Sequence, residues 1–273
     1  MSTHPVLLLA GCGKMGGAML AGWIDDGLPP ANVHIVEPAD ELRENLIADY
    51  EVLAVAADDA LPTDLKPDIV ILAVKPQMMD AVAPAYARFV GPGTAFLSIA
   101  AGKTIAAFEK LLGNDAAIIR AMPNTPAAVG RGMTVCVPNE HVSDDQRSLA
   151  QTLLEAVSKV AWVEDEALMD AVTGVSGSGP AYVFQMTECL AKAGEEAGLP
   201  RELARQLARA TVCGAGELMH LSADEPETLR KNVTSPGGTT AAGLEVLMDP
   251  ETGWERIVVR AVEAAAKRSR ELA

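Results

Sequence analysis

The 273-residue sequence has few basic residues. Its 22 lysines and arginines are outnumbered by 37 aspartates and glutamates, which gives a formal net charge of −15 at pH 7. Nucleic acids and anionic membrane surfaces both require a basic footprint, so we expect neither as a partner. No apolar run approaches the ~20 residues of a membrane helix, and no basic segment precedes the first apolar run. We therefore expect no membrane span and no secretory signal peptide.

Cysteine and histidine are also scarce, with four of each. The cysteines have neither metal-ligand nor redox spacing and stand in apolar sequence, which is typical of reduced packing residues and favours a cytoplasmic location. They are Cys12, Cys136, Cys189 and Cys213. The histidines are scattered without carboxylate or cysteine partners at ligand spacing. We therefore expect no bound metal and no histidine-based catalysis.

Hydrophobic residues, by contrast, make up 49% of the chain. In the first half they form short runs that alternate with segments of helical periodicity, and several runs are apolar throughout, as in strands buried on both faces. This alternation predicts a Rossmann-type α/β fold with a doubly wound parallel sheet. The expected strands are 6–10, 33–36, 52–55, 69–73, 95–99 and 117–121, with edge strands at 133–137 and 161–163. The expected helices are 15–26, 40–49, 77–89, 105–112 and 143–157.

After Glu164 the strand signals stop and apolar residues recur at helical spacing. We interpret residues 1–163 as a dinucleotide-binding domain and 164–273 as an all-helical domain, which a long helix beginning near Glu166 could join. The apolar stripes of the second domain exceed what so few residues would bury among themselves. We therefore expect an oligomer, with packing inside one chain as the alternative.

The segment that organises the first domain is the loop from Gly11 to Gly16. Gly11, Gly13 and Gly16 match the G-x-G-x-x-G fingerprint, with a strand before it and a helix after it. The first glycine makes the tight turn, the second lets the backbone approach a pyrophosphate, and the third lets the helix pack on the strand. Free N–H groups at the helix start would face the phosphates. The loop therefore predicts a bound dinucleotide.

Glu37 ends the second expected strand. An acidic residue there accepts hydrogen bonds from the ribose hydroxyls and repels a 2′-phosphate, which favours NADH over NADPH. A solvated loop glutamate is the alternative.

Three further segments follow strands and would lie along the same rim of the sheet. They are Ala73-Val74-Lys75-Pro76, Ala100-Ala101-Gly102 and Met122-Pro123-Asn124-Thr125-Pro126. Lys75 could touch cofactor phosphate or ribose, or be an exposed loop cation.

Two glycine-rich stretches open helices in the second half. The first stretch is expected either to line a site or to form a sharp capped bend between two helices; it is Ser176-Gly177-Ser178-Gly179-Pro180. Thr234-Ser235-Pro236-Gly237-Gly238-Thr239-Thr240 offers hydroxyls and free N–H groups at a helix start, where a carboxylate binds. An elaborate N-cap is its alternative. Because we see no lysine or arginine close by, a small carboxylated substrate fits better than a phosphorylated one.

Together these segments resemble the pyrroline-5-carboxylate reductase family over nearly the whole chain. The stretches that carry the resemblance are 11–16, 73–76, 120–126, 174–182 and 235–240, and the last two are far more specific than the glycine loop. The resemblance implies a Rossmann domain followed by a helical dimerisation domain, with the substrate where they meet, close to a subunit interface. It also implies reduction of 1-pyrroline-5-carboxylate to L-proline by NADPH or NADH, in a homodimer or a ring of dimers.

The resemblance further implies roles for single residues. Cofactor contacts would be Gly11, Cys12, Gly13, Lys14, Met15, Gly16, Glu37, Ala73, Val74, Lys75, Pro76 and Ala101, with Asn232 from the helical domain. The substrate carboxylate would bind the backbone of Gly237, Gly238, Thr239 and Thr240 beside Ser235. Thr240 would hydrogen-bond the ring nitrogen as the catalytic residue, and Glu166 matches a position near the substrate amine. Many members carry a small or hydroxylated residue where Glu37 stands, which makes the cofactor preference of this chain a separate question.

Two other functions are compatible with parts of the pattern. A β-hydroxyacid dehydrogenase also pairs a Rossmann domain with a helical one, but needs a catalytic lysine soon after its glycine-rich helix start. Here the first lysine after Gly179 is Lys192. A nucleotide-sensing regulator without turnover would be favoured by a depleted Ser/Thr site, whereas the stretch from Ser235 to Thr240 is intact.

Overall fold

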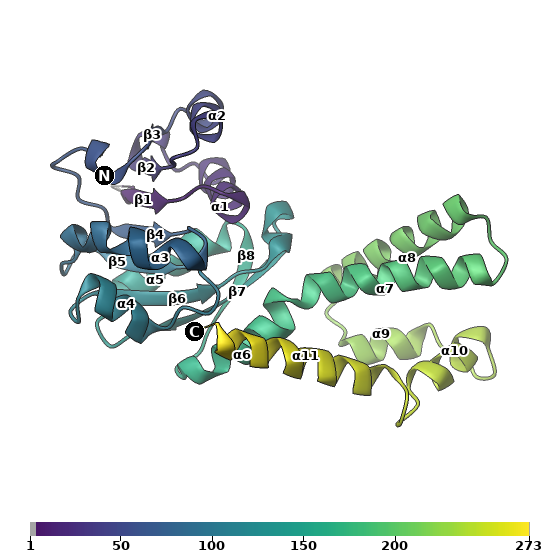
Figure 1. Cartoon of the computed structure of the whole chain (residues 1–273). Helices are drawn as coiled ribbons and strands as arrows, with labels where there is room; N and C mark the ends of the chain where they lie inside the picture. Colours follow the sequence, from purple (N-terminus) through teal and green to yellow (C-terminus); the bar gives the residue numbers. More distant parts are fainter. Residues whose placement is uncertain (1–3, 273) are drawn as a thin grey trace. The chain divides into compact units, whose positions relative to one another are not determined.

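The computed structural model describes residues 4–272, and its contacts divide the chain into two compact units (Figure 1). The first unit contains the residues up to Gly177 together with those from Ala265 onward, and the second unit is Ser178–Ala264. Our predicted division lies between residues 163 and 164. By contacts, however, the segment 164–177 and the end of the chain belong with the first unit.

The first unit is built on one eight-stranded sheet in the order β3-β2-β1-β4-β5-β6-β7-β8. Its strands are β1 (Leu7–Ala10), β2 (Val33–Val36), β3 (Leu53–Val55), β4 (Ile69–Leu72), β5 (Ala95–Ser98), β6 (Ala117–Met122), β7 (Gly132–Pro138) and β8 (Ser158–Trp162). The predicted Rossmann-type sheet is confirmed, and all its strands were expected. All neighbours are parallel except β6 and β7. The sheet is mostly parallel, and the antiparallel direction of β7 was not expected, because apolar runs do not encode strand direction.

Helices cover both faces of this sheet (Figure 1). In β1, Leu7 and Leu9 join one buried cluster and Leu8 and Ala10 join the other, because successive strand side chains point to opposite faces. The first cluster also includes residues of α1 (Lys14–Asp25), α2 (Asp40–Tyr50) and α5 (Asp144–Glu155), and the second includes residues of α3 (Met79–Val82) and α4 (Ile105–Leu112). The sheet is thus the buried core, and its loops carry the candidate site.

One predicted helix of this unit is wrong. Residues 77–89 form a 3₁₀ turn at Pro76–Met78, the short helix α3, and a 3₁₀ stretch at Ala83–Phe89. Pro84 explains the difference, because its ring removes a backbone N–H and clashes with the carbonyl four residues earlier. The other predicted helices are confirmed, with ends shifted by no more than two residues.

The single long helix expected from Glu166 is also wrong. The chain forms a 3₁₀ turn at Glu166–Leu168, then α6 (Met169–Val172), then a π-helical stretch at Thr173–Gly177. Asp170 of α6 accepts a hydrogen bond at 2.6 Å from the hydroxyl of Ser269, near the chain's end. This contact is one reason why the last residues belong to the first unit.

The second unit is all-helical. Its helices are α7 (Gly179–Glu196), α8 (Arg201–Leu221), α9 (Pro226–Asn232), α10 (Thr239–Leu247) and the greater part of α11 (Trp254–Glu271). Helices α7 and α8 lie side by side (Figure 1), and an added Cβ at Gly194 would lie 3.2 Å from the Cβ of Ala204. Small residues therefore allow these two helices to approach closely.

Candidate functional site

The carboxyl ends of the parallel strands meet at one rim of the sheet. The register aligns Ala10 of β1 with Val36 of β2 and Leu72 of β4, and Leu72 with Ser98 of β5. The strand order changes direction at β1, which lies between β2 and β4. Ligands of open α/β sheets bind outside the carboxyl ends at such a switch point. The predicted cofactor segments of the first unit, 11–16, Glu37, 73–76 and Ala101, all follow these strands.

The three glycines of the 11–16 loop have different geometries. Gly11 has a φ of +83°, and an added Cβ there would lie 2.9 Å from Cγ1 of Val74. At Gly16, an added Cβ would lie 2.9 Å from the carbonyl oxygen of Gly11, whereas at Gly13 nothing lies within 4 Å. Gly11 thus makes the turn, Gly16 allows close packing of helix on strand, and Gly13 leaves the backbone open to an approaching phosphate.

Helix α1 begins immediately after this open glycine. Gly13 is its N-cap, and among residues 4–272 no side-chain hydrogen bond caps the helix. The carbonyl of Gly13 accepts the first helical hydrogen bond, from the N–H of Gly17 at 2.8 Å. An uncapped helix N-terminus presents free donors and a partial positive charge to an anion. The loop therefore fits the pyrophosphate of a dinucleotide.

The carboxylate of Glu37 is held by the backbone of the site. Its Oε2 accepts a hydrogen bond from the N–H of Cys12 at 2.9 Å, and its Oε1 accepts one from the N–H of Ala39 at 3.0 Å. Glu37 is only 8% exposed, which excludes the alternative of a solvated loop glutamate. An acid in this position, beside the glycine loop, is the arrangement that binds an unphosphorylated ribose.

Cys12 places a buried thiol in the same loop. Burial, followed by the nearby charge of Glu37, raises the pKa of Cys12 to about 12. The thiol is therefore protonated and neutral at pH 7. It adds no negative charge to a site that must accept phosphates.

The loops after β4 and β5 complete this rim. Lys75 follows β4 and is exposed, which is compatible with a cofactor contact and with a plain loop cation. After β5, Gly102 has a φ of +77°, and an added Cβ would lie 3.0 Å from the Cβ of Leu272. Leu272 thus packs tightly against the loop that carries Ala101.

Asn124 organises the loop after β6, and the sequence did not single it out. Its side-chain oxygen accepts a hydrogen bond from the N–H of Met133 at 2.9 Å. Its amide nitrogen donates to the hydroxyl and carbonyl oxygens of Ser176 at 3.2 and 3.3 Å. One side chain therefore joins the rim loop, the start of β7 and the π-helical stretch. The only hint in the sequence is an amide between two prolines.

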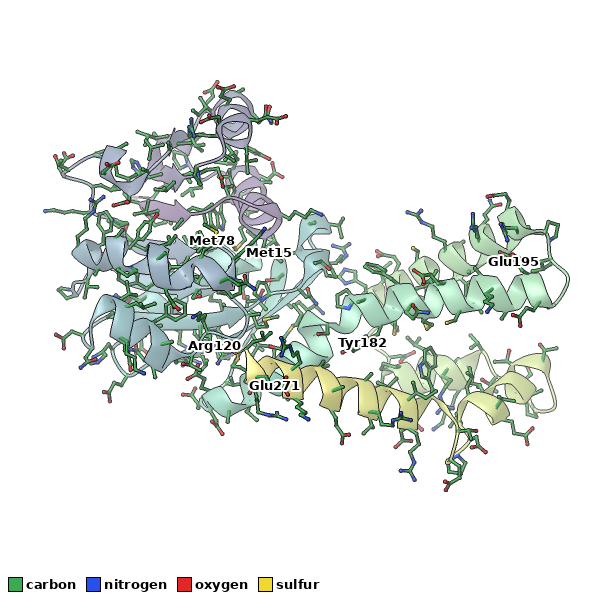
Figure 2. All side chains as sticks on the ribbon, in the orientation of Figure 1. Met15, Met78, Arg120, Tyr182, Glu195 and Glu271 are labelled. Atoms are coloured by element: carbon green, nitrogen blue, oxygen red, sulfur yellow. The ribbon has the colours of Figure 1, made fainter. Side chains whose placement is uncertain are left out.

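Glu166 makes two contacts inside the first unit. Its Oε1 accepts a hydrogen bond from Nη1 of Arg120 at 2.7 Å and from the N–H of Ile105 at 2.9 Å. Arg120, labelled in Figure 2, is a strand residue of β6 whose side chain is 6% exposed. Ile105 is the first residue of α4. The carboxylate that the resemblance places near a substrate amine is thus bound to a buried guanidinium and a helix N-terminus.

The predicted substrate loop lies in the second unit. Gly237 has a φ of +70°, and the N–H of Gly238 donates to the carbonyl of Ser235 at 3.0 Å, which turns the chain into α10. Gly238 is the N-cap of α10, and no side chain in the described part of the chain caps the helix. The alternative of an elaborate side-chain N-cap is therefore not realised. The N-terminus of α10, with the exposed Thr239 and Thr240, is open to an anion.

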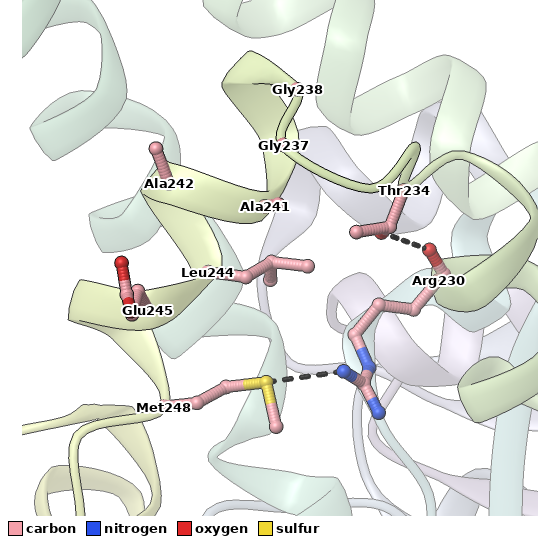
Figure 3. A pocket seen from close by; sticks show the side chains of 9 residues that line it. All are labelled: Arg230, Thr234, Gly237, Gly238, Ala241, Ala242, Leu244, Glu245 and Met248. Carbon is pink, nitrogen blue, oxygen red and sulfur yellow. Dashed lines mark hydrogen bonds between the residues drawn. The ribbon is translucent and has the colours of Figure 1, made fainter.

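A pocket of about 530 Å³ opens beside this loop (Figure 3). It is lined by residues of α9, the loop and α10: Arg230, Thr234, Gly237, Gly238, Ala241, Ala242, Leu244, Glu245 and Met248. Nη1 of Arg230 lies 3.1 Å from the sulfur of Met248, and Thr234 donates its hydroxyl hydrogen to the carbonyl of Arg230 at 2.6 Å. Our expectation that no arginine lies near the loop is wrong, because the turn after α9 folds the loop back over Arg230. Asn232, in the last turn of α9, is exposed.

Two of the four free cysteines differ from expectation. Cys12 and Cys136 are buried, but Cys189 and Cys213 are exposed on helices of the second unit. Between residues 4 and 272, no group of three or more His, Cys, Asp or Glu side chains could hold a metal ion. Within the same range, no helix is long and apolar enough to cross a membrane.

Two family descriptions match parts of the sequence. Residues 166–272 match a sequence model described as pyrroline-5-carboxylate reductase dimerisation. Residues 6–102 match one described as NADP oxidoreductase, coenzyme F420-dependent. The first match covers the predicted substrate loop, and the second covers the glycine loop and Glu37.

Relatives match along the whole chain. The sequence is 40% identical to a pyrroline-5-carboxylate reductase of Pseudomonas aeruginosa over 273 residues, covering 100% of this chain and 98% of that protein. It is 43% identical to that of a Synechocystis species, covering 97% of each. Among solved structures, a pyrroline-5-carboxylate reductase from Coxiella burnetii has a TM-score of 0.92 at 32% identity over 99% of both chains. A Plasmodium falciparum pyrroline carboxylate reductase with NADP bound has a TM-score of 0.80 at 29% identity over 98% of both.

Proposed function

The chain belongs to the pyrroline-5-carboxylate reductase family, and from this premise we propose which of its residues carry the reaction. The protein is an NAD(P)H-dependent oxidoreductase that reduces the C=N bond of 1-pyrroline-5-carboxylate to give L-proline, the last step of proline biosynthesis. The observation that carries this function is the full-length similarity, which includes both the open glycine loop and the uncapped start of α10.

We assign the cofactor to the rim of the sheet. The N–H groups of Gly13, Lys14 and Met15 would bind the pyrophosphate, because α1 has no side-chain cap. Val74, Lys75, Pro76 and Ala101 would border the cofactor farther along the rim, and Asn232 would contribute from the helical unit. When bound, NAD(P)H supplies the hydride.

We further propose that the chain uses NADH at least as well as NADPH. Glu37 stands at the ribose position with both carboxylate oxygens fixed by backbone N–H groups, so that a 2′-phosphate would meet a buried negative charge. The Plasmodium falciparum relative was solved with NADP bound. Replacing Glu37 with Ser is expected to raise kcat/KM for NADPH and lower it for NADH. A strong preference of the unmodified chain for NADPH would contradict this role.

We assign the substrate to the loop that opens α10. The N–H groups of Thr239 and Thr240 would bind the carboxylate, because the N-cap Gly238 has no side chain to cap them, while the N–H of Gly238 itself donates to the carbonyl of Ser235. Gly237 and Ser235 shape the turn, and the hydroxyl of Thr240 would hydrogen-bond the ring nitrogen. The site holds no histidine, and none is needed, because a cyclic imine is basic enough to take its proton from water. These residues mainly orient the imine toward the hydride, which is a positioning task.

The test is a steady-state assay with pyrroline-5-carboxylate and each nicotinamide cofactor. We expect oxidation of the cofactor to match formation of proline one to one. A six-membered cyclic imine acid serves as the comparison substrate, since the same carboxylate and nitrogen contacts could hold it. Folded protein that turns over neither imine with either cofactor would refute the assignment.

The match to the dimerisation model indicates that the chain forms an oligomer. We propose that it is a homodimer, or a ring of such dimers, and that it acts in the cytoplasm. The four free cysteines support this location, because reduced thiols persist there.

A further inference from the structure

Residues 37–43 follow β2 and contain three acidic residues and one basic residue. Glu37, Asp40 and Glu41 are the acids, and Arg43 is the only lysine or arginine between Lys14 and Lys66. This segment is where dinucleotide-binding sheets distinguish a free ribose from a 2′-phosphorylated one. A 2′-phosphate bound there would depend on Arg43.

The guanidinium of Arg43 is already engaged. Nη2 lies 2.6 Å from Oδ1 of Asp40, and Nη1 donates to the carbonyl oxygens of Glu37 and Pro38 at 3.0 and 3.4 Å. Its side chain is 18% exposed, whereas that of Asp40 is 82% exposed. The guanidinium of Arg43 thus binds the main chain through Nη1 and the carboxylate of Asp40 through Nη2.

Glu37 and Asp40 therefore act on a phosphate in different ways. The carboxylate of Glu37 binds the N–H groups of Cys12 and Ala39, and no lysine or arginine of the described residues pairs with it, so that its charge faces the ribose position unneutralised. The carboxylate of Asp40 binds Nη2 of the one guanidinium in this segment, and this is the nitrogen that would otherwise be available to a phosphate, because Nη1 is held by main-chain carbonyls.

We propose that Asp40 is a specificity-determining residue: by pairing with Arg43, it withholds the only cation of this segment from a 2′-phosphate. The proposal rests on the proposed NAD(P)H-dependent function and deepens it, because it names a second determinant besides Glu37. An exposed ion pair is weak, so its loss is worth a factor of at most about five in an equilibrium. Asp40 therefore adjusts a preference that Glu37 sets.

The experiment measures binding of ADP-ribose and 2′-phospho-ADP-ribose by titration calorimetry. Neither fragment carries nicotinamide, so the readout does not depend on turnover. We expect Asp40→Ala to lower the Kd of the phosphorylated fragment by a factor of about two to five, while the Kd of ADP-ribose changes by less than that. Adding Arg43→Gln should cancel the gain.

Glu41→Ala is the matched control. Glu41 lies beside Asp40 in the first turn of α2 and carries the same charge, but the ion pair of Arg43 is with Asp40. If the two alanine variants improve phosphate binding equally, the effect is general charge removal and the Asp40 assignment is overturned. The same holds if the gain survives Arg43→Gln. If the unmodified chain binds neither fragment, the proposed cofactor site is refuted, and the proposed role of Asp40 is refuted with it.

Discussion

Cys12 and Cys136 are buried thiols whose protonation is linked to folding. Burial raises the pKa of each to about 12 from an ordinary value of 9.0, and the charge of Glu37 adds to the effect at Cys12. Between pH 9 and 12 the unfolded chain loses protons that the folded chain keeps. The free energy of unfolding therefore falls as pH rises, by at most about 1.4 kcal/mol per pH unit for each thiol.

This predicts a specific pH profile. The free energy of unfolding, measured with urea, should contain a constant contribution from these thiols below pH 9. Above pH 9 this contribution should decline. In Cys12→Ala and Cys136→Ala the decline should be shallower than in the unmodified chain. Burial also raises the pKa of Tyr86, which adds a decline common to all variants. Identical slopes in all three proteins would show that the thiols ionise without unfolding.

Thr240 is the residue that we propose as catalytic, through its hydroxyl group. We predict that Thr240→Ala lowers turnover by about one to three orders of magnitude, as expected for the loss of one positioned donor. Thr240→Ser is the matched control, because it keeps the hydroxyl and removes only a methyl group. Near-normal kcat/KM in the alanine variant would remove Thr240 from the mechanism.

At the scale of elements, Glu166 joins α4 to β6. Arg120 is buried, and its partner carboxylate also binds the first N–H of α4. Removing that carboxylate leaves a buried guanidinium uncompensated, so we predict that Glu166→Ala lowers the free energy of unfolding by about 2–3 kcal/mol. Adding Arg120→Leu should restore a large part of the loss, because the buried charge is then gone.

The same variant separates two roles of Glu166. If the carboxylate acts by holding the loop that leads into α4, Glu166→Ala should raise the KM of the cofactor more than that of the imine. A higher KM for the imine with unchanged urea unfolding would instead support the contact near the substrate amine that the family resemblance implies.

The sequence predicted these elements unequally, for physical reasons. The central strands were predicted because buried runs such as 69–73 are apolar throughout, whereas β8 begins at Ser158, three residues before the expected start. The antiparallel direction of β7 depends on a return path that no local pattern records. The contact between Arg120 and Glu166 spans 46 residues and required the fold. Arg230 was missed because a turn, and not the spacing along the chain, places it beside Gly237. Glu37 was found because the glycine fingerprint fixes where the next strand must end.

At the scale of the whole molecule, the second unit leaves much apolar surface uncovered. Neither α9 nor α10 contains a buried residue within the described chain. Large apolar side chains on the four longest helices of this unit are exposed, among them Phe184 at 62%, Leu218 at 54%, Val246 at 72% and Ile257 at 56%. Short helices are marginal in water unless they bury a face, so a partner surface is required, as the dimerisation match indicates.

Phe184 and Val129 provide a test of which surface associates. Both are exposed, but Phe184 lies on α7 inside the matched dimerisation region, whereas Val129 is 73% exposed in the first unit and lies outside that region. We predict that the unmodified chain is a dimer or larger by light scattering at micromolar concentration. Phe184→Asp should weaken association about tenfold or more, because a charge would replace a large apolar contact. Val129→Asp should leave the mass unchanged. A stable monomer of the unmodified chain, or equal effects of the two substitutions, would contradict an interface formed by the helical unit.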